Sequence, residues 1–375
     1  MSLTITHLPF TIYHLPLHIY HLPLHIYHYT FTITLSAAKI LVTGGCGYIG
    51  SHTIVDLITS GYEVVSVDNG VNSSFDVLDG IEAITGKRII NINVDLSETE
   101  EALEAIKPYG PFHGIIHFAA LKSVEESVHK PLRYFRNNIG STLTTLALME
   151  NMDIPHLIFS SSCTVYGTPA KLPVTEDTPF GRAENPYGAT KQTGEILYDQ
   201  FFKNKAGKSG ISLRYFNPAG AHPSALIGES PTQNATNLVP VITETAIGLR
   251  EQLTVFGDDY PSRDGSCVRD YVHVTDLARA HTLAIEHLLQ HKNDNKYEVY
   301  NLGIGEGVTV LEAIYAFQQA TGVSVNYKIG PRRSGDVAAI YADNARITDH
   351  LGWKPSQDIQ SIMQSAWAWE KARRK

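Results

Sequence analysis

A glycine-rich turn between a short apolar run and a helix-like segment restricts the fold of this chain more than any other feature. Ile40–Thr43 is typical of a buried strand and leads directly into GGCGYIG at positions 44–50. A helix-like stretch continues to Ser60, and Glu63–Asp68 is a second strand-like run. This succession predicts a βαβ unit with parallel strands.

The glycines of this turn, Gly44, Gly47 and Gly50, favour dinucleotide binding. Glycine permits close approach of a pyrophosphate, which the free N–H groups of a helix N-terminus then stabilise. Asp68 ends the second strand, where a carboxylate can accept hydrogen bonds from an adenosine ribose and would repel the extra phosphate of NADP. A lone glycine triplet often marks only a tight turn, but together with the strands and the acid it predicts NAD.

The alternation of strands and helices continues along the chain. Further strand-like runs are Ile89–Asp95, Gly114–Ala119, His156–Ser161 and Ile211–Phe216, and helical stretches cover Glu98–Ile106, roughly Leu132–Glu150, and Pro186–Phe202. The pattern predicts an α/β fold, a Rossmann-type doubly wound parallel sheet, with a smaller C-terminal substrate-binding domain. We expect residues 39–216 to be mainly the NAD-binding domain. Residues 217–375 should be mainly the substrate domain, with some segments returning to the first.

Three side chains that suit the oxidation of a hydroxyl group follow the buried run that ends at Ser161. They are Ser162, Tyr187 and Lys191. Ser162 should emerge at the carboxyl edge of the sheet, where open α/β folds bind ligands. Tyr187 and Lys191 are at i and i+4 of the next helix and therefore share a face. A phenol has a pKa of about 10, but a neighbouring ammonium and the charge of NAD⁺ would lower it and make Tyr187 a usable base. Packing of a Tyr–Lys pair is the alternative, and it is weakened by the glycine turn and Ser162.

The composition excludes several classes of protein. Lys+Arg total 30 against Asp+Glu 38, a formal net charge of −8, which disfavours nucleic-acid and polybasic membrane partners. The cysteines are Cys46, Cys163 and Cys267, without CxxC spacing, so we expect neither a disulfide framework nor a metal site, and a reducing cytoplasm as the location. No apolar run free of Pro and His is long enough to predict a membrane span.

The first 38 residues differ from the rest of the chain. They contain no Asp, Glu, Lys or Arg and repeat HLPFTIY or HLPLHIY from His7 to Tyr27. A proline in every copy disfavours helix and central strand alike. We interpret residues 1–38 as a low-complexity His/Pro tail that is disordered, or that results from a start codon assigned too far upstream. Any metal affinity of its histidines would be accidental.

Several longer motifs identify residues 39–375 as similar to the extended short-chain dehydrogenase/reductase family. They are VTGGCGYIGSHT (42–53), HFAALKSVEESVHKP (117–131), FSSSCTVYG (159–167), NPYGATK (185–191), LRYFNPAGAHP (213–223), VRDYVHVTDLA (268–278) and RRSGD (332–336). The resemblance is to the nucleotide-sugar epimerases of this family. It implies reversible interconversion of UDP-glucose and UDP-galactose at C4 through a 4-keto intermediate, NAD retained through turnover, and a homodimer built on a helix bundle.

The resemblance also assigns roles to individual residues. The catalytic set would be Ser162, Tyr187 and Lys191. The NAD site would take, besides the three glycines and Lys191, Tyr48, Ile49, Asp68, Asn69, Asn72, Ser73, Asp95, Leu96, Phe118, Ala119, Ala120, Lys122, Asn137 and Phe216. The UDP-hexose site would take, besides Ser162 and Tyr187, Asn217, Asn237, Leu238, Arg269, Arg333, Asp336 and Ile340.

Arg269 and Arg333 suit a diphosphate, because planar guanidinium groups bond phosphate oxygens in pairs. The alternative for both is an ion pair with Asp270 or Asp336. Ile340 stands four residues after Asp336, at the position that in the family helps to decide whether an N-acetylated sugar fits.

Two other functions compete with epimerisation. A nucleotide-sugar 4,6-dehydratase of the same family must eliminate water and needs an Asp-Glu pair beside the catalytic hydroxyl, where this chain has Cys163 and Thr164. A non-catalytic NAD(H) sensor would not need an intact Ser–Tyr–Lys set, which this chain has.

Overall fold

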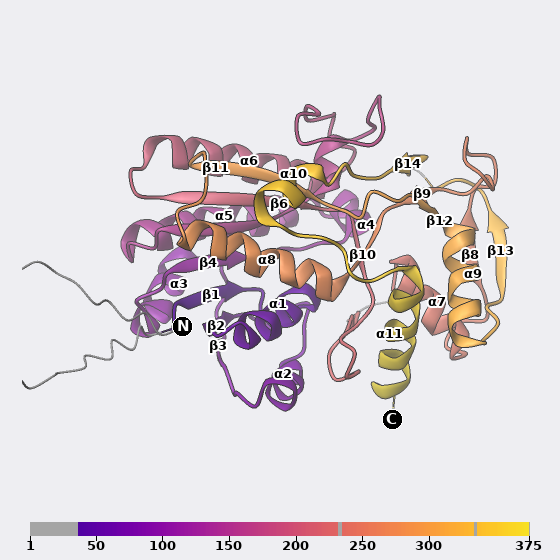
Figure 1. Cartoon of the computed structure of the whole chain (residues 1–375), viewed down its shortest axis with the longest axis horizontal. Coiled ribbons are helices and arrows are strands. Elements are labelled where there is room, and N and C mark those ends of the chain that lie inside the picture. Colours follow the sequence, from indigo (N-terminus) through magenta and orange to yellow (C-terminus); the bar gives the residue numbers. More distant parts are fainter. Residues whose placement is uncertain (1–36, 232–234, 334–335, 375) are drawn as a thin grey trace, which may run out of the picture. The chain divides into compact units, whose positions relative to one another are not determined.

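A seven-stranded parallel sheet forms the centre of the described chain (Figure 1). The structure is a computed structural model that describes residues 37–231, 235–333 and 336–374. The strands lie in the order β11-β6-β5-β4-β1-β2-β3. Their bounds are Lys39–Thr43 (β1), Glu63–Val67 (β2), Ile90–Ile92 (β3), Gly114–His117 (β4), His156–Ser162 (β5), Ser209–Tyr215 (β6) and Tyr297–Leu302 (β11). The order reverses between β1 and β4, which is the switch point where doubly wound sheets bind ligands.

Helices cover both faces of this sheet. In β1, Ile40 and Val42 belong to one apolar cluster and Leu41 to another, so the strand is buried on both sides. The first cluster takes side chains from α1 (Tyr48–Thr59), α2 (Val77–Thr85), α8 (Val274–Leu289) and α10 (Ala345–Leu351). The second takes them from α3 (Thr99–Ile106), α5 (Pro131–Asn151) and α6 (Pro186–Asn204). The predicted α/β fold with a Rossmann-type doubly wound sheet is thus confirmed.

Most of the remaining elements come from the C-terminal half and form a third apolar cluster and three small sheets. The helices are α7 (Leu238–Ala246), α9 (Val310–Thr321) and α11 (Ile359–Ala372). The strands are β7 (Asn217–Ala219), β8 (Leu253–Phe256), β9 (Val268–Arg269), β10 (Tyr271–His273), β12 (Val308–Thr309), β13 (Tyr327–Gly330) and β14 (Ala339–Ile340). Because β11 and α8 join the central sheet and its covering layer, the sequence after 217 contributes to both parts. The domain boundary at 216/217 stays a prediction.

The structure shifts some predicted element bounds. The strand expected over Ile89–Asp95 is confined to β3, because the chain turns where the Asp95 carboxylate accepts hydrogen bonds from the backbone and hydroxyl of Ser97. The sequence pattern did not indicate α2, α4 (Val124–His129) or the 3₁₀ turns Lys107–Tyr109 and Cys163–Tyr166. The interpretation of residues 1–38 falls almost entirely outside the described residues.

Neither a membrane-spanning helix nor a metal-binding cluster is present among the described residues. Among the helices in these ranges, none has the length and apolar character needed to cross a bilayer. No three His, Cys, Asp or Glu side chains in the same ranges are grouped so that they could hold a metal ion.

Candidate active site

The glycine turn lies at the switch point and leaves no room for a side chain at Gly44 or Gly50. Gly44 has φ +69°, and a Cβ there would lie 2.8 Å from the backbone nitrogen of Ala119. A Cβ on Gly50 would lie 2.2 Å from the carbonyl oxygen of Gly44. Gly47 is the N-cap of α1, and no side chain within the described residues caps this helix start. The first-turn N–H groups of α1 are therefore suited to an anion such as a dinucleotide pyrophosphate.

Asp68 directly follows β2, and its carboxylate is held by the loops around it. One oxygen accepts from the backbone N–H of Cys46 at 3.0 Å. The other accepts from the backbone N–H of Gly70 at 2.9 Å and from the Ser73 hydroxyl at 2.7 Å. These contacts fix the carboxylate beside the glycine turn, in the position that a ribose-binding acid needs.

The other predicted cofactor residues lie around the same edge of the sheet with differing exposure. Asn69 donates to Asp95 at 3.1 Å, which joins the loop after β2 to the loop after β3. Leu96 is buried, Asn72 and Lys122 are exposed, and Ile49, Phe118, Ala119, Ala120 and Asn137 are half-buried. Lys122 forms an ion pair with Glu229 at 3.2 Å. The residues after β1, β2, β3 and β4 thus meet where one dinucleotide could contact all four strand ends.

Sequence reasoning named Asn137 but missed its neighbour Asn138, which is buried on α5. The Asn138 amide accepts from the backbone N–H of Leu121 at 2.8 Å and donates to the Leu121 carbonyl at 3.1 Å. It also donates to the Thr190 hydroxyl at 3.0 Å. Asn138 therefore ties the loop after β4 to α6, which carries Tyr187 and Lys191. A polar residue among buried positions of α5 was the available signal.

The three catalytic candidates meet at the end of β5 and the start of α6. Ser162 is the last residue of β5, and α6 begins at Pro186 with Asn185 as N-cap, accepting from the Gly188 N–H at 2.9 Å. The Lys191 Nζ lies 5.7 Å from the centroid of the Tyr187 ring and donates to the Ser160 carbonyl oxygen at 2.5 Å. The Ser162 side chain also lies close enough to the Tyr187 phenol to lower its pKa. The structure thus brings all three residues together.

Burial dominates the titration of this group. Burial lowers the pKa of Lys191 from 10.5 to about 7, although the charge of Glu195 opposes that change. Burial also raises the pKa of the Tyr187 phenol, and it outweighs the opposite effect of Ser162. The lowering of the Tyr187 pKa that the sequence predicts for the NAD⁺ complex is therefore not present in the chain by itself. The positive charge of a bound nicotinamide would act in the opposite direction, toward the phenolate.

The predicted diphosphate-binding arginines converge on one carboxylate. Arg333 donates to Asp336 at 2.9 Å and 3.2 Å, and the Arg269 Nη2 lies 3.5 Å from the same carboxylate. Arg269 is further held by the carbonyls of Val268 and Val337, both at 2.8 Å. The ion pair that the sequence left as an alternative is therefore present, but Arg333 remains half exposed. The two guanidinium groups lie close enough together to act on one anion.

The remaining predicted residues lie on either side of this arginine pair. Asn217 begins β7, and its N–H donates to the carbonyl of Asp270 at 2.9 Å. Asn237 is the N-cap of α7 and donates to Glu229 at 2.9 Å, and Leu238 follows it, half-buried. Ile340 is buried in an apolar cluster with Phe216 and pairs in register with Arg269. Ile340 thus forms part of a packed wall.

A buried ion pair behind the catalytic group was missed by sequence reasoning. Arg214 of β6 donates to Glu195 of α6 at 2.9 Å and 2.7 Å, and both side chains are almost fully buried. Ser161, next to Ser162, donates to the same carboxylate. Glu195 is one helical turn beyond Lys191 on α6. Its contacts with Arg214 and Ser161 therefore link α6 to β6 and to the end of β5, which carries Ser162. A charged residue inside the apolar run ISLRYF was the signal that could have indicated it.

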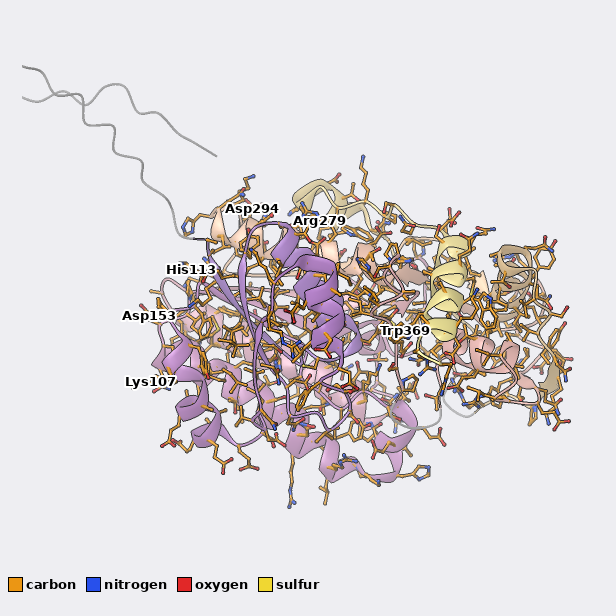
Figure 2. All side chains as sticks on the ribbon, turned by 90° about the horizontal axis from the view of Figure 1, so that it is seen from below. Lys107, His113, Asp153, Arg279, Asp294 and Trp369 are labelled. Carbon is orange, nitrogen blue, oxygen red and sulfur yellow. The ribbon has the colours of Figure 1, made fainter. Side chains whose placement is uncertain are left out.

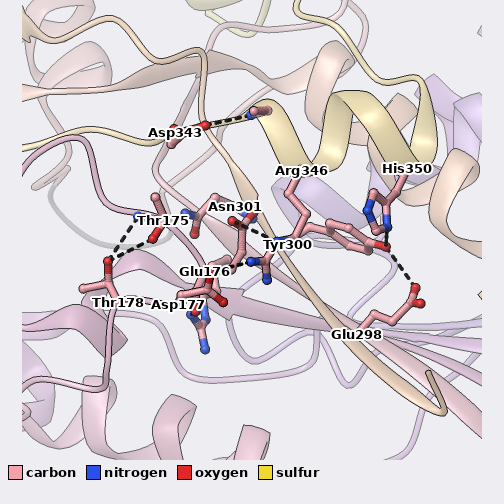
Figure 3. Close-up of polar contacts among 12 residues, drawn as sticks. Thr175, Glu176, Asp177, Thr178, Glu298, Tyr300, Asn301, Asp343, Arg346 and His350 are labelled. Carbon is pink, nitrogen blue, oxygen red and sulfur yellow. Dashed lines mark hydrogen bonds and ion pairs between the residues drawn. The ribbon is translucent and has the colours of Figure 1, made fainter. Parts of the chain in front are cut away.

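Polar contacts continue from this ion pair toward α10. Arg214 donates to the Tyr166 hydroxyl at 2.9 Å, which donates to Asn301 at 2.6 Å. The Asn301 N–H donates to Glu176 at 2.8 Å, and Glu176 also pairs with Arg346, as Figure 3 shows. The strand edge at β11 is thereby connected to the segment around Glu176.

Comparisons with known proteins agree with this geometry. The profile of the family described as GDP-mannose 4,6 dehydratase matches residues 41–366. A UDP-glucose 4-epimerase from Dictyostelium discoideum is 46% identical over 88% of this chain and 95% of its own length. One from Bacillus subtilis is 45% identical over 88% of this chain and 96% of its own length. The chain belongs to the UDP-glucose 4-epimerase family.

Solved structures of this family superpose closely on the described fold. The UDP-glucose 4-epimerase of Stenotrophomonas maltophila, with bound NAD and formylated UDP-arabinopyranose, has a TM-score of 0.86 at 42% identity and covers 90% of this chain and 99% of its own. That of Bifidobacterium longum, in complex with NAD⁺ and UDP, has a TM-score of 0.85 at 43% identity with the same coverage. The family membership expected from the motifs is confirmed.

Proposed function

We propose that this chain interconverts UDP-glucose and UDP-galactose at C4 through a transient 4-keto sugar, with tightly held NAD as cofactor. The meeting of Ser162, Tyr187 and Lys191 beside the glycine turn and Asp68 carries the proposal. The family's curated members and its solved complexes with NAD support it. Gly44 and Gly50 have no space for a Cβ, and the lack of side chains there lets a pyrophosphate approach the backbone of the turn. The chain's own residues therefore suit the cofactor.

The proposed chemistry divides between three side chains. Tyr187 takes the proton from the sugar's 4-hydroxyl group, and Ser162 orients that hydroxyl. Lys191, when it is protonated, supports the phenolate of Tyr187, and its side chain would contact the nicotinamide ribose. NAD⁺ supplies the hydride acceptor for C4 and, after the sugar has turned over, the hydride donor. Because the same carbon is oxidised and then reduced from its other face, the net redox change is zero.

The residues after Ser162 favour epimerisation over dehydration. Elimination of water needs an acid for the leaving hydroxyl, and a 4,6-dehydratase uses an Asp-Glu pair at these positions. Burial raises the pKa of the Cys163 thiol to about 12, so it stays neutral, and the hydroxyl of Thr164 is not ionisable at neutral pH. The matching profile is named for a dehydratase, but the residues that dehydration requires are absent at 163 and 164. A sensor role is disfavoured by the intact catalytic set.

A homodimer is part of this proposal. Large apolar side chains are exposed on α4, α5 and α6, at Val128, Leu132, Leu143 and Ile196. Such side chains on adjoining helices suit an interface built from packed helices. Light scattering of the purified protein should give twice the chain mass. A monomer at micromolar concentration would contradict the dimer.

We also infer a cytoplasmic location. Cys46, Cys163 and Cys267 are free thiols in the structure, as expected of a protein in a reducing compartment. Fractionation of the source cells would test this inference.

The decisive experiment supplies UDP-galactose to purified protein without added NAD. We expect UDP-glucose to form, and denatured protein to release NAD in near-stoichiometric amount. Tyr187→Phe is the matched control and should retain NAD but lose turnover. Stoichiometric reduction of NAD with accumulation of a keto sugar would refute epimerisation, and a dehydrated product would favour the dehydratase.

A further inference from the structure

One carboxylate oxygen links residues predicted to serve two different ligands. Glu229 lies in the loop between β7 and α7, and its Oε1 accepts from Lys122 Nζ at 3.2 Å and from Asn237 Nδ2 at 2.9 Å. Lys122 follows β4, among the predicted NAD residues. Asn237 starts α7, among the predicted UDP-hexose residues. Glu229 itself is not among the residues that the sequence predicts for either site.

The backbone around Glu229 is held by the C-terminal helix. The indole N–H of Trp369, the residue labelled beside α11 in Figure 2, donates to the Glu229 carbonyl at 2.9 Å. A Cβ on Gly228 would lie 2.5 Å from the Trp369 ring, so the ring packs directly on the chain there. The Glu229 side chain is only 10% exposed, whereas that of Lys122 is 60% exposed. The carboxylate is therefore the buried member of the cluster, and the lysine is the exposed one.

The same carboxylate is close to the glycine turn. Burial and the charge of Glu229 raise the pKa of the Tyr48 phenol well above its usual value. Tyr48 itself donates to the Gly220 carbonyl at 2.6 Å, and the Lys122 ammonium lies 5.9 Å from its ring centroid. An uncompensated carboxylate here would repel a diphosphate, and Lys122 neutralises it. The orientation of Lys122 thus depends on Glu229.

We propose that Glu229 is a positioning residue that couples the cofactor side of the site to the UDP-hexose side by holding Lys122 and Asn237 together. The proposal rests on the proposed function for the identity of the two ligands. Because Glu229 contacts one residue of each predicted site, nucleotide-sugar affinity and NAD retention should change together when Glu229 is altered.

A double-mutant cycle on the holoenzyme tests the coupling. Lys122→Met and Asn237→Ala are made singly and together, with and without Glu229→Ala, and KM for UDP-galactose and the rate of NAD loss are measured. With Glu229 present, we expect the combined effect on KM to differ from the product of the single effects by about threefold or more. With Glu229→Ala, the effects should simply multiply. The proposal would be overturned if the effects of Lys122→Met and Asn237→Ala on KM multiply both with Glu229 and with Glu229→Ala. It would also be overturned if their coupling is equal in the two cases.

Single variants separate positioning from a general structural role. Glu229→Ala should raise KM about tenfold, a change of about 1.4 kcal/mol, with kcat within about twofold and faster NAD loss. Glu229→Gln keeps an acceptor for Asn237 but loses the charge, so its KM should lie between those of the natural protein and Glu229→Ala. It also replaces the alanine variant in the test if that variant does not fold. Glu150→Ala, which breaks an ion pair with Lys205 elsewhere on the surface, should change neither quantity.

A fall in kcat at unchanged KM in Glu229→Gln would overturn the positioning role. Failure of the natural chain to convert UDP-galactose would refute the proposed function instead, because coupling of NAD loss to Glu229 can be measured without turnover. The two failures are therefore distinguishable.

Discussion

Replacing Lys191 by methionine is expected to make the protein more stable and less active at the same time. The side chain is 5% exposed, and burial lowers its pKa from 10.5 to about 7. At about 1.4 kcal/mol for each pKa unit, this difference corresponds to roughly 5 kcal/mol of destabilisation when the lysine is protonated in both states. Loss of the hydrogen bond to the Ser160 carbonyl offsets about 1–3 kcal/mol of that gain.

The sign and the pH range follow from the two pKa values of Lys191. Between about pH 7 and 10.5 the unfolded chain binds more protons than the folded one, so the stability of the natural protein rises with pH. Below pH 7 both states are protonated and the penalty is complete. The advantage of Lys191→Met should therefore be greatest, roughly 2–4 kcal/mol, at pH 6 and should decrease by about 1.4 kcal/mol per pH unit above pH 7.

Urea unfolding of nucleotide-free protein, followed by tryptophan fluorescence at pH 6, 7, 8 and 9, measures this difference. Lys203→Met is the matched control, because Lys203 is an exposed lysine on the same helix, paired with Asp199 at 2.5 Å. The control should show little pH-dependent difference. A pH-independent difference for Lys191→Met, or a variant less stable than the natural protein at pH 6, would refute the reasoning.

Three further predictions concern the catalytic group, its buried support and the sugar pocket. Tyr187→Phe should lower kcat by about 10²–10⁴-fold and Ser162→Ala by less, because Tyr187 is the base whereas Ser162 only orients the hydroxyl. Steady-state kinetics in which Ser162→Ala loses more kcat than Tyr187→Phe would contradict these roles. Arg214→Met should cost about 3–5 kcal/mol in urea unfolding by leaving Glu195 buried and unpaired, and adding Glu195→Gln should restore much of it; no restoration would argue against a pair effect. The natural chain should have a lower kcat/KM for the UDP-N-acetylhexose pair than for UDP-galactose and UDP-glucose. Ile340→Gly should make this difference in kcat/KM smaller, and Ile340→Tyr should make it larger. If neither substitution changes it, another wall residue sets the limit.

The parts of the site that depend on local sequence were predictable. The glycine turn, Asp68 at the tip of β2 and the i, i+4 spacing of Tyr187 and Lys191 are short-range relations, and the periodicity of the flanking strands and helix places them at one sheet edge. Parallel pairing then brings the strand ends together, which is why the sequence alone predicts that Ser162 lies beside α6.

The electrostatics of the site required the tertiary structure. Lys191 and Tyr187 titrate as they do because burial removes water from them, and burial is a property of packing between elements far apart in the chain. The partner of Arg214 could not be read from its surroundings in sequence, and Glu229 meets Lys122 across 107 positions. Hydrophobic periodicity determines which face of a strand or helix is buried, but it does not determine which polar groups on those faces meet, because that depends on the register of non-adjacent elements.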